Sequence, residues 1–547
     1  MTNFGERRRG AVVLLAGGLA ALALAAVLAT VVAAVDHTRH NLSETGALTS
    51  ASPDLAVGDR VAVVWTEDYD QDGPDSGKGY GHVYLRSGLE DGGGWGSKTP
   101  VFSGDASSYA IKSSVAVAGT EAHVAYVVLE YSYYRVYYKK CDLTLGTCGS
   151  SFQIESVAKS SNKITWVDVA VDGSGNPRIV WARYDASGQN GDIFYKAYNG
   201  SNWGGREDVA VGGGNDGAPA IAWANGYVHV VWNDEQYYSI YYKRRSDAGT
   251  WGGSTPLYST SSHEEQPYKP DVAAWGGRVF VVWDWCSEDI FHSPFTEPYC
   301  DYFSLSYRRS NDDGDSWLPY RDVGTDQTGS TSHQVYESTD AEELALSELR
   351  PSIALNDEGW PTVVWHVGGS GEGDRYKINY AYALDGATSS VNWVISHTVL
   401  NQDTSTHASV AAAVMDGQHL HTVYMQGDEW DVYYEGFTYY PHAVINAPAM
   451  VAVTQPVTIT LDGSGSYDPQ GAPVITYTWA LIQKPSGSAV SLSNPSAVAP
   501  TIILDELGRY KVTLQVETAL ASSPVTTKSI LAAENVYIVY LPLVMRQ

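Results

Sequence analysis

The sequence predicts an all-β fold from three observations: its composition, a unit repeated seven times, and a change of composition near residue 441. The chain has 547 residues, of which 53 are glycine, 38 tyrosine and 17 tryptophan, while only 18% are charged. Many glycines and aromatic residues with few charges are typical of short strands joined by tight turns. They exclude a coiled coil, a helical bundle and a disordered acidic chain. The length predicts two or three domains.

The chain is acidic, with 34 Lys and Arg residues against 62 Asp and Glu residues and a formal net charge of −28. Such a surface repels phosphate backbones and anionic lipid headgroups. We therefore expect no nucleic-acid partner and no docking on anionic membranes. Solubility at neutral pH is the plain explanation of the charge.

The first 36 residues predict an export segment. Arg7, Arg8 and Arg9 precede an uncharged stretch at 11–35, which is long enough to span a bilayer as a helix. Small residues at 32–34 offer a cleavage site, so a cleaved signal peptide and a retained signal anchor both stay open. In either case we expect the rest of the chain to be extracellular or at the cell surface, with membrane contact only through this segment if it is uncleaved. Residues 37–52 are assigned to a linker.

Four cysteines form two local pairs, Cys141 with Cys148 and Cys286 with Cys300. An even number, local pairing and export together predict two disulfides. A metal site is the weaker alternative, because no CxxC motif or nearby histidine pair accompanies them.

Residues 53–440 contain seven copies of one unit. Each copy has an apolar strand, a tight turn and a second apolar strand with an aromatic residue at its end, followed by a third strand centred on a tyrosine. The seven aromatic residues are Trp65, Tyr126, Trp181, Trp232, Trp283, Trp365 and Tyr424. Four antiparallel strands repeated about every 50 to 60 residues are typical of a β-propeller. The predicted fold is therefore a seven-bladed β-propeller, with these aromatic residues in its core.

The turn at 310–317 carries a further resemblance. Its sequence, SNDDGDSW, resembles the Asp-box (Ser-x-Asp-x-Gly-x-Thr-Trp) of the sialidase and BNR-repeat propellers, with Ser310, Asp312, Gly314 and Trp317 at the matching positions. The turns at 246–251, 199–203 and 91–95 are shortened or degraded versions. The resemblance covers about residues 50–440. It implies a folding element whose Asp caps backbone N–H groups and whose Trp packs between blades, and it says little about catalysis.

At residue 441 Tyr and Trp become rarer, while Val, Thr, Ser and Pro become more frequent. Residues 461–471, 474–479 and 508–516 match, in order and spacing, the pattern of a PKD-type immunoglobulin-like domain. This resemblance implies a small β-sandwich at 441–535 that serves as a spacer or adhesion unit. The apolar tail at 536–547 is too short to span a membrane. It is either a further strand or a sorting or attachment signal.

Candidate ligand residues lie on one face of the predicted propeller, where the loops between second and third strands emerge with the connections between blades. The loops from Trp65 to Tyr84 and from Trp283 to Tyr307 are enlarged, as is the passage at 324–349. In sialidase-like propellers this is the ligand face, and long loops on a rigid scaffold tend to carry function. Carboxylates beside aromatic rings are typical of a sugar site, although a solvated loop is the alternative. The candidates are Glu67, Arg183, Asp234, Asp284, Trp285, His292, Tyr299 and His366.

The first of these loops has carboxylates at alternate positions, Asp68, Asp70 and Asp72. Such spacing before a glycine turn can present oxygens to calcium. Gly79 stands where a calcium loop carries its glutamate, so a solvated acidic loop stays open as the alternative. No other cofactor is expected.

Two functions follow from these observations. The preferred one is an exported or cell-surface recognition or adhesion protein that binds a glycan or an extracellular protein. The alternative is a sialidase-like exo-glycoside hydrolase. The family's chemistry needs three arginines for the substrate carboxylate, a Tyr–Glu pair as nucleophile and an Asp acid/base. Nothing in the sequence shows that three arginines converge, and no catalytic residue is assigned. The arginines available are Arg60, Arg178, Arg183, Arg278 and Arg350.

Overall fold

The computed structural model describes residues 37–44, 50–67, 81–89, 92–260, 265–287, 302–323, 336–337, 351–356, 359–367, 377–383, 393–396, 408–416, 419–427, 430–438, 441, 443–453, 456–468, 473–518, 523 and 525–534. Within these residues the chain forms strands and turns and no helix. In particular, the described part has no helix long and apolar enough to cross a membrane. The expected N-terminal helix (1–36) and the apolar tail (536–547) lie outside the described residues.

The first four sheets follow one another along the chain. Sheet 1 contains β2 (Ser50–Val57), β3 (Val61–Glu67), β4 (His82–Gly88) and β5 (Thr99–Phe102). Sheet 2 contains β6 (Ser108–Ala118), β7 (Glu121–Glu130), β8 (Tyr133–Asp142) and β10 (Phe152–Ala158), with β9 (Thr147–Cys148) paired to β8. Sheet 3 contains β11 (Asn162–Val171), β12 (Pro177–Asp185), β13 (Asp192–Ala197) and β14 (Glu207–Ala210). Sheet 4 contains β15 (Asp216–Ala224), β16 (Tyr227–Asp234), β17 (Ser239–Ser246) and β18 (Thr255–Ser259).

Three further sheets complete this part of the molecule. Sheet 5 contains β19 (Glu265–Trp275), β20 (Arg278–Ser287), β21 (Tyr302–Ser310) and β22 (Arg321–Asp322), with β23 (Tyr336–Glu337) paired to β21. Sheet 6 contains β24 (Ser352–Leu355), β25 (Pro361–Val367), β26 (Lys377–Ala383) and β27 (Trp393–Ser396). Sheet 7 contains β28 (Ala408–Asp416), β29 (His419–Gln426), β30 (Asp431–Thr438) and β1 (His37–Asn41).

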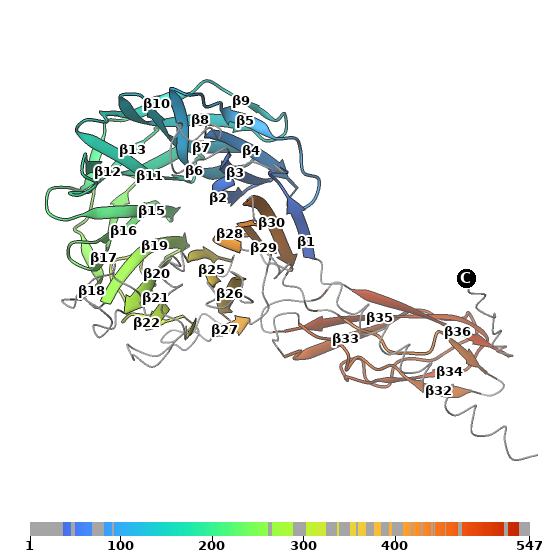
Figure 1. Cartoon of the computed structure of the whole chain (residues 1–547). Coiled ribbons are helices and arrows are strands. Elements are labelled where there is room, and N and C mark those ends of the chain that lie inside the picture. Colours follow the sequence, from blue (N-terminus) through green and yellow to red (C-terminus); the bar gives the residue numbers. More distant parts are fainter. Residues whose placement is uncertain are drawn as a thin grey trace, which may run out of the picture.

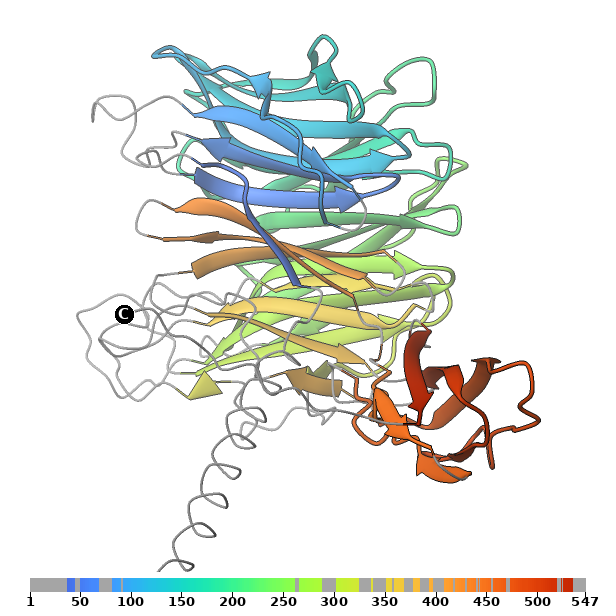
Figure 2. The ribbon, with the colours of Figure 1, turned by 90° about the vertical axis from the view of Figure 1, so that its right-hand side faces the viewer.

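The seven sheets are arranged around an axis in a β-propeller-like ring, with first strands such as β6, β11 and β15 nearest the centre (Figure 1). Figure 2 shows the same ring from its side. An apolar cluster lies between each sheet and the next, and a further cluster joins sheet 7 to sheet 1. Each sheet therefore buries both of its faces. This explains why second strands such as β3 are buried at every position and lack apolar–polar alternation.

The aromatic residue at the end of each second strand is buried, as predicted from the repeat. Trp65, Trp181 and Trp283 are fully buried, and the other four residues of this set are at most 2% exposed. Burial of one such ring stabilises the fold by roughly 2–3 kcal/mol. These rings fill the space between sheets, and Trp232 also lines a cavity.

The tryptophan after the third strand makes a second repeated contact between sheets. Trp95, Trp203, Trp251 and Trp317 each lie edge-on to the third-strand tyrosine of the preceding sheet, with ring centroids 4.7–5.3 Å apart. This edge-to-face geometry is favourable for aromatic pairs.

At 310–317 the turn is held by its own side chains. The Gly314 amide donates to Ser310 Oγ (2.8 Å), and the Ser316 amide donates to Asp312 Oδ1 (2.8 Å). The turn therefore holds Trp317 in place against Tyr242.

The ring is closed by the first described strand. Residues 37–41, which the sequence analysis assigns to a linker, form β1 and pair with β30 as the fourth strand of sheet 7. The contact extends beyond the strand, because Asn41 and Ser43 both donate to the carboxylate of Asp431 at 2.8 Å. The linker assignment differs from the structure because a five-residue polar strand carries no pattern of its own. Its pairing comes from a partner almost 400 residues away.

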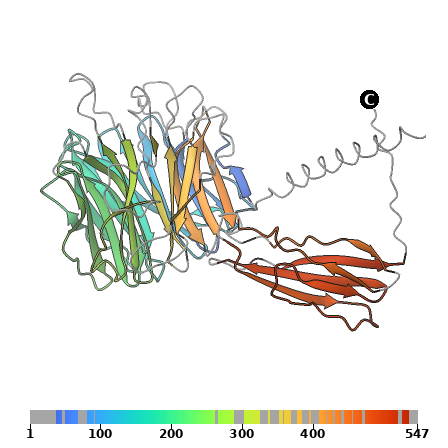
Figure 3. The same cartoon turned by 90° about the horizontal axis from the view of Figure 1, so that it is seen from below.

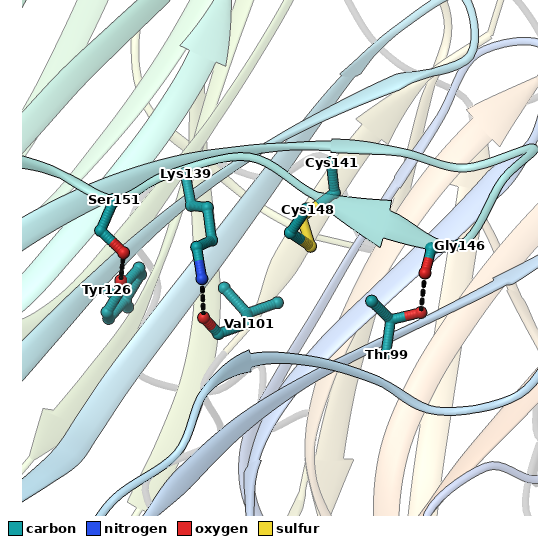
Figure 4. The surroundings of a disulfide bond; sticks show 8 residues. All are labelled: Thr99, Val101, Tyr126, Lys139, Cys141, Gly146, Cys148 and Ser151. Carbon is teal, nitrogen blue, oxygen red and sulfur yellow. Dashed lines mark hydrogen bonds between the residues drawn. A yellow bond between two sulfur atoms is a disulfide. The ribbon is translucent and has the colours of Figure 1, made fainter.

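One of the two expected disulfides lies in the described residues. Cys141 and Cys148 are bonded across the β8–β9 hairpin. Figure 4 shows how this hairpin reaches sheet 1: Thr99 Oγ1 donates to the Gly146 carbonyl (3.2 Å), and nearby Lys139 donates to the Val101 carbonyl (2.5 Å). The disulfide thus fixes a hairpin that bridges two sheets. The second expected pair, Cys286 with Cys300, lies outside the described residues, because Cys300 is not among them and only the backbone of Cys286 is.

Residues 443–534 form a separate all-β unit, seen in Figure 3 beside the ring. One sheet contains β31 (Met450–Ala452), β36 (Thr526–Ala533), β35 (Gly508–Glu517) and β33 (Thr476–Gln483), and a second pairs β32 (Val457–Thr460) with β34 (Thr501–Leu504). Both sheets contribute to one apolar core around Trp479 and Tyr510. The unit therefore has a core of its own, built from two facing sheets.

Candidate functional site

The candidates predicted at the ends of second strands are found at one end of the ring, but most of them have structural partners. Glu67 is buried, accepts a hydrogen bond from the Trp65 indole (3.0 Å) and pairs with Lys98 (3.0 Å). This ion pair lies beside the cluster between sheets 7 and 1. Glu67 therefore has structural partners and is not an exposed ligand residue of the kind that the sequence analysis expected on this face.

Arg183 is likewise engaged. Its guanidinium pairs with Asp192 (3.2 Å) and lies 4.2 Å from the centroid of the Phe194 ring. Asp192 also accepts the Gly212 amide (3.0 Å). These contacts fix the start of β13, and the guanidinium is committed to them.

Three further candidates are largely closed to solvent. Asp284 and His366 are 1% and 3% exposed, and the Trp285 indole donates to the Tyr258 hydroxyl (3.0 Å) within the contact between sheets 4 and 5. Five other predicted residues lie outside the described residues: Asp68, Asp70, Asp72, His292 and Tyr299. Among the residues that are described, no group of three or more His, Cys, Asp or Glu side chains could hold a metal ion.

Asp234 does line a cavity. A hollow of about 420 Å³ lies between sheets 3 and 4, on the face of the second-to-third-strand loops. Asp234 stands directly opposite Asp216 in the β15–β16 pairing. Residues opposite each other in antiparallel strands point to the same side, with Cβ atoms about 5 Å apart. The register therefore brings two buried carboxyl groups, 7% and 4% exposed, together in the lining of this cavity.

The two carboxyl groups are held differently. Asp216 accepts the Trp232 indole N–H (2.9 Å), whereas Asp234 Oδ1 accepts the backbone amides of residues 215, 236 and 237 at 3.0–3.3 Å. Burial, assisted by the charge of Asp234, raises the pKa of Asp216 to about 7. Asp216 can therefore carry a proton near neutral pH and donate a hydrogen bond, while Asp234 is fixed by the backbone.

Aromatic side chains form the wall of the same cavity. Trp232 and Tyr241 are stacked with centroids 5.7 Å apart, and Tyr237 reaches the surface with 50% of its area exposed. Lys243 also lines the cavity, is half-buried and donates to the Val209 carbonyl (2.7 Å). A cavity with carboxyl groups, a half-exposed ring and one engaged lysine can accept and donate hydrogen bonds to hydroxyl groups beside an apolar surface.

Gly214 allows Asp234 to take this position. A Cβ atom at residue 214 would lie 2.3 Å from Asp234 Oδ2, so the loop passes the carboxylate only without a side chain. The sequence analysis identified Asp234 but missed Asp216, Tyr237 and Tyr241. Glycines 212–214 before a strand were the available signal, since a run of glycine marks a close backbone approach.

A second cavity, of about 260 Å³, runs along the axis between the first strands. Asp54, Asp168 and Asp271 line it, and each accepts a backbone amide of the next sheet (Val115, Ile221 and Ile353) at 2.9 Å. Ser114 of sheet 2 also donates to Asp168 (2.6 Å). Burial raises the pKa of Asp168 to about 7 and that of Asp271 to about 6. Since these oxygens join neighbouring sheets, we interpret the three carboxyls as structural links.

A local distortion of the first strands aims these aspartates at their partners. Each of the three strands has a register shift just before its aspartate, after Ala51, Ile164 and Tyr268. Such β-bulges bend the strand and re-aim the side chain that follows. In β2 and β19 the bulge includes a residue with positive φ, Ser52 (49°) and Lys269 (41°).

The four described arginines among those singled out from the sequence do not converge on one cavity. Arg178 binds Asp172 and the Tyr198 carbonyl at the start of β12, and Arg278 donates to the Gly359 carbonyl at the start of β20. Both starts face the opposite end of the ring from Arg183, which is near the end of β12. Arg60 precedes β3 at that same opposite end, and Arg350 lies outside the described residues.

Two tyrosine–glutamate contacts are found among the described residues. Tyr137 donates to Glu130 (3.4 Å) in a half-buried part of sheet 2, beside Arg135, which pairs with the same glutamate (3.2 Å). The other contact is enclosed. Tyr424 donates to Glu435 (2.6 Å), and both side chains are fully buried in sheet 7. Burial, together with the charge of Glu435, raises the pKa of Tyr424 well above its usual value. A substrate cannot reach this hydroxyl, and its raised pKa makes it a poorer nucleophile.

No protein-family model and no curated protein sequence matches this chain. Solved structures with a similar arrangement include the Hadza microbial sialidase Hz136 (10% identity, TM-score 0.39, covering 71% of this chain and 66% of that one). Another is the polysaccharide lyase Uly1 (9% identity, TM-score 0.43, covering 71% of this chain and 90% of that one). A third is the Trypanosoma rangeli sialidase in complex with the inhibitor DANA (9% identity, TM-score 0.38, covering 90% of this chain and 95% of that one). At this identity and superposition, nothing about activity follows from these likenesses.

Proposed function

We propose that this protein binds neutral glycans through the cavity between sheets 3 and 4. The observation that carries the proposal is the convergence of Asp216, Asp234 and Tyr237 on one hollow of about 420 Å³. A half-exposed ring offers an apolar face to a sugar, and carboxyl groups bind its hydroxyls. A concave polar hollow suits a saccharide better than the flat surface of an extracellular protein.

Charge narrows the class of glycan. The cavity is lined by the aspartates at 208, 216 and 234 against the single lysine at 243, and the chain as a whole carries a formal net charge of −28. A sialic acid carboxylate would be repelled here. We therefore propose a neutral sugar, in contrast to the sialylated ligand that the sialidase resemblance implies.

The finer architecture supports an exported recognition protein. We propose that the ring is a seven-bladed propeller with an Asp-box at 310–317, and that residues 441–535 are a PKD-type module. Such a module would hold the ring away from the cell surface or serve as an adhesion unit. The export segment at 1–36 makes an extracellular or cell-surface location the consistent one.

Glycoside hydrolysis is the second candidate, and one observation favours it. Two carboxyl groups face each other, and that of Asp216 has its pKa raised to about 7. Glycosidases use a protonated carboxyl as general acid beside a second carboxylate. Asp234 is tied to three backbone amides, which leaves its other oxygen as the free base or nucleophile in this candidate.

The binding proposal is tested on an array of neutral and sialylated glycans, with and without EDTA. We expect the full chain to bind neutral members and Tyr237→Ala to weaken that binding at least tenfold. Tyr131→Ala is the matched control, because Tyr131 is 90% exposed in the second-to-third-strand turn of sheet 2. Equal binding by all three proteins would place the ligand elsewhere. A loss with EDTA would implicate the Asp68, Asp70 and Asp72 loop in calcium binding.

Mass spectrometry of the same glycans after incubation separates the two candidates. An unchanged mixture supports recognition without hydrolysis. Loss of a sugar mass that Asp216→Asn abolishes would support hydrolysis, and the product would identify the bond that is cleaved.

A further inference from the structure

A larger cavity lies on the opposite face of the ring, between sheets 2 and 3. Its volume is about 560 Å³, and every residue around it belongs to the continuous described segment 92–260. The first-to-second-strand turn of sheet 3 and the short turn at 198–203 form its rim. It shares no lining residue with the hollow between sheets 3 and 4.

A buried histidine with an unused ring nitrogen lines this cavity. His123 is 3% exposed, and its Nδ1 is 2.8 Å from the Tyr138 hydroxyl. Its Nε2 has no hydrogen-bond partner. Burial lowers the pKa of His123 to about 4, so the ring is neutral at pH 7. A buried polar atom without a hydrogen-bond partner is unfavourable.

The cavity exists because of the length of one turn. Sheet 4 contains the same arrangement, with His229 Nδ1 2.8 Å from the Tyr242 hydroxyl and Trp317 edge-on to Tyr242. There the long turn at 310–317 fills the space, since a Cβ on Gly314 would lie 1.9 Å from the Tyr242 hydroxyl. The His229 Nε2 also lacks a partner. The two arrangements therefore differ in the space next to Tyr138, which the shorter turn at 198–203 leaves unfilled.

The lining indicates a neutral ligand with one apolar face. Glu121 and Lys140 neutralise each other in an ion pair (2.7 Å), and His123 carries no charge. Phe152 and Trp203 are stacked with centroids 5.6 Å apart, and Phe152 is 43% exposed. Aromatic rings beside uncharged hydrogen-bonding groups suit the C–H face and the hydroxyls of a pyranose.

We propose that this cavity is a second carbohydrate site, which takes a single neutral pyranose unit on the face opposite the glycan cavity. The two sites would let one ring contact two saccharide chains, or two parts of a branched one, at once. This site stands on its own residues and does not depend on the glycan cavity.

The test uses saturation-transfer NMR and titration calorimetry on the full chain, with glucose, galactose, mannose and N-acetylglucosamine as probes. We expect at least one of these sugars to bind. Ser201→Trp, at an exposed position on the rim, should fill the cavity and weaken binding at least tenfold. Ala248→Trp makes the matched change in the corresponding turn of sheet 4 and should leave binding unchanged.

Two outcomes would overturn the proposal: no sugar of the panel binds, or Ser201→Trp binds as wild type does. His123→Leu tests the histidine as a whole, because it removes both ring nitrogens and the contact with Tyr138. It should weaken sugar binding, and its unfolding midpoint in urea reports separately whether the fold is intact. Tyr237→Ala keeps the two sites distinguishable. If it abolishes array binding but not binding of the monosaccharide, both sites exist; if it abolishes both, only the first does.

Discussion

Replacing Asp168 by alanine tests whether the first strands of the ring are joined through their aspartates. Asp168 accepts three hydrogen bonds: from Ser114 Oγ in sheet 2 (2.6 Å), from the Ile221 amide in sheet 4 (2.9 Å) and from the amide of its neighbour Val169 (2.8 Å). One side chain in sheet 3 therefore connects the sheets on both of its sides.

The expected cost follows from the donors that lose their acceptor. Ser114 and Ile221 are 3% and 7% exposed, so water reaches them poorly. Each buried donor without a partner costs about 1–3 kcal/mol, which predicts a loss of about 3 kcal/mol for Asp168→Ala. Ser114→Ala removes one donor together with its bond and should cost about 1 kcal/mol. In the double variant the two effects should fall short of their sum by about 1 kcal/mol, because they share one hydrogen bond.

The assay is urea unfolding of the full chain at pH 5, below the folded pKa of about 7 of Asp168, followed by tryptophan fluorescence. Thr165→Ala is the control, since Thr165 is exposed in the same channel on the same strand. Thr165→Ala should change the free energy of unfolding by no more than about 0.5 kcal/mol. If Asp168→Ala were no more destabilising than Thr165→Ala, the links between first strands would not stabilise the ring.

Three further predictions concern other parts of the ring. Asp168→Asn should gain stability relative to wild type as pH rises from 5 to 8, by at most about 1.4 kcal/mol per pH unit. The reason is that a carboxyl whose folded pKa is raised to about 7 stabilises the fold at low pH and loses that contribution as pH rises through 7. Urea titrations at several pH values check this, and a difference in unfolding free energy that stays constant with pH would contradict it. Replacing Cys141 and Cys148 together by serine should cost about 2.5 kcal/mol through the loop of eight residues that they close, and a melting temperature equal to that of the reduced wild type is the control. Gly314→Ala should cost at least about 2 kcal/mol, because φ there is +84° and the new methyl would meet Tyr242; Gly253→Ala, with nothing within 4 Å, should be neutral by thermal melting.

The features that could be predicted from the sequence are those that each repeat carries by itself. Trp65 and its six counterparts end an apolar strand, so their burial follows from the local pattern. Cys141 and Cys148 are seven residues apart, and that spacing alone brings them together across a hairpin.

The features that could not be predicted depend on which residue stands opposite which. Glu67 was expected as a ligand residue, but it pairs with Lys98, which is 31 residues away on the far side of a third strand. Asp216 is a candidate site residue because it lies opposite Asp234. That pairing is set by a register shift within β15 between residues 217 and 220. A composition or a repeat pattern does not specify such pairings, so the site was recognised only in part.

The closure of the ring by β1 has a consequence for how the molecule assembles during synthesis. The bonds from Asn41 and Ser43 to Asp431 join residues separated by 390 and 388 positions. At about 5–20 residues per second, the ribosome needs on the order of half a minute to deliver the partner. During that interval β1 is an unpaired strand edge, open to pairing with another chain. The strand His37–Asn41 is short and contains an arginine and two histidines, so it pairs poorly with strands of other chains. Its polar sequence thereby protects the incompletely synthesised protein from mispairing.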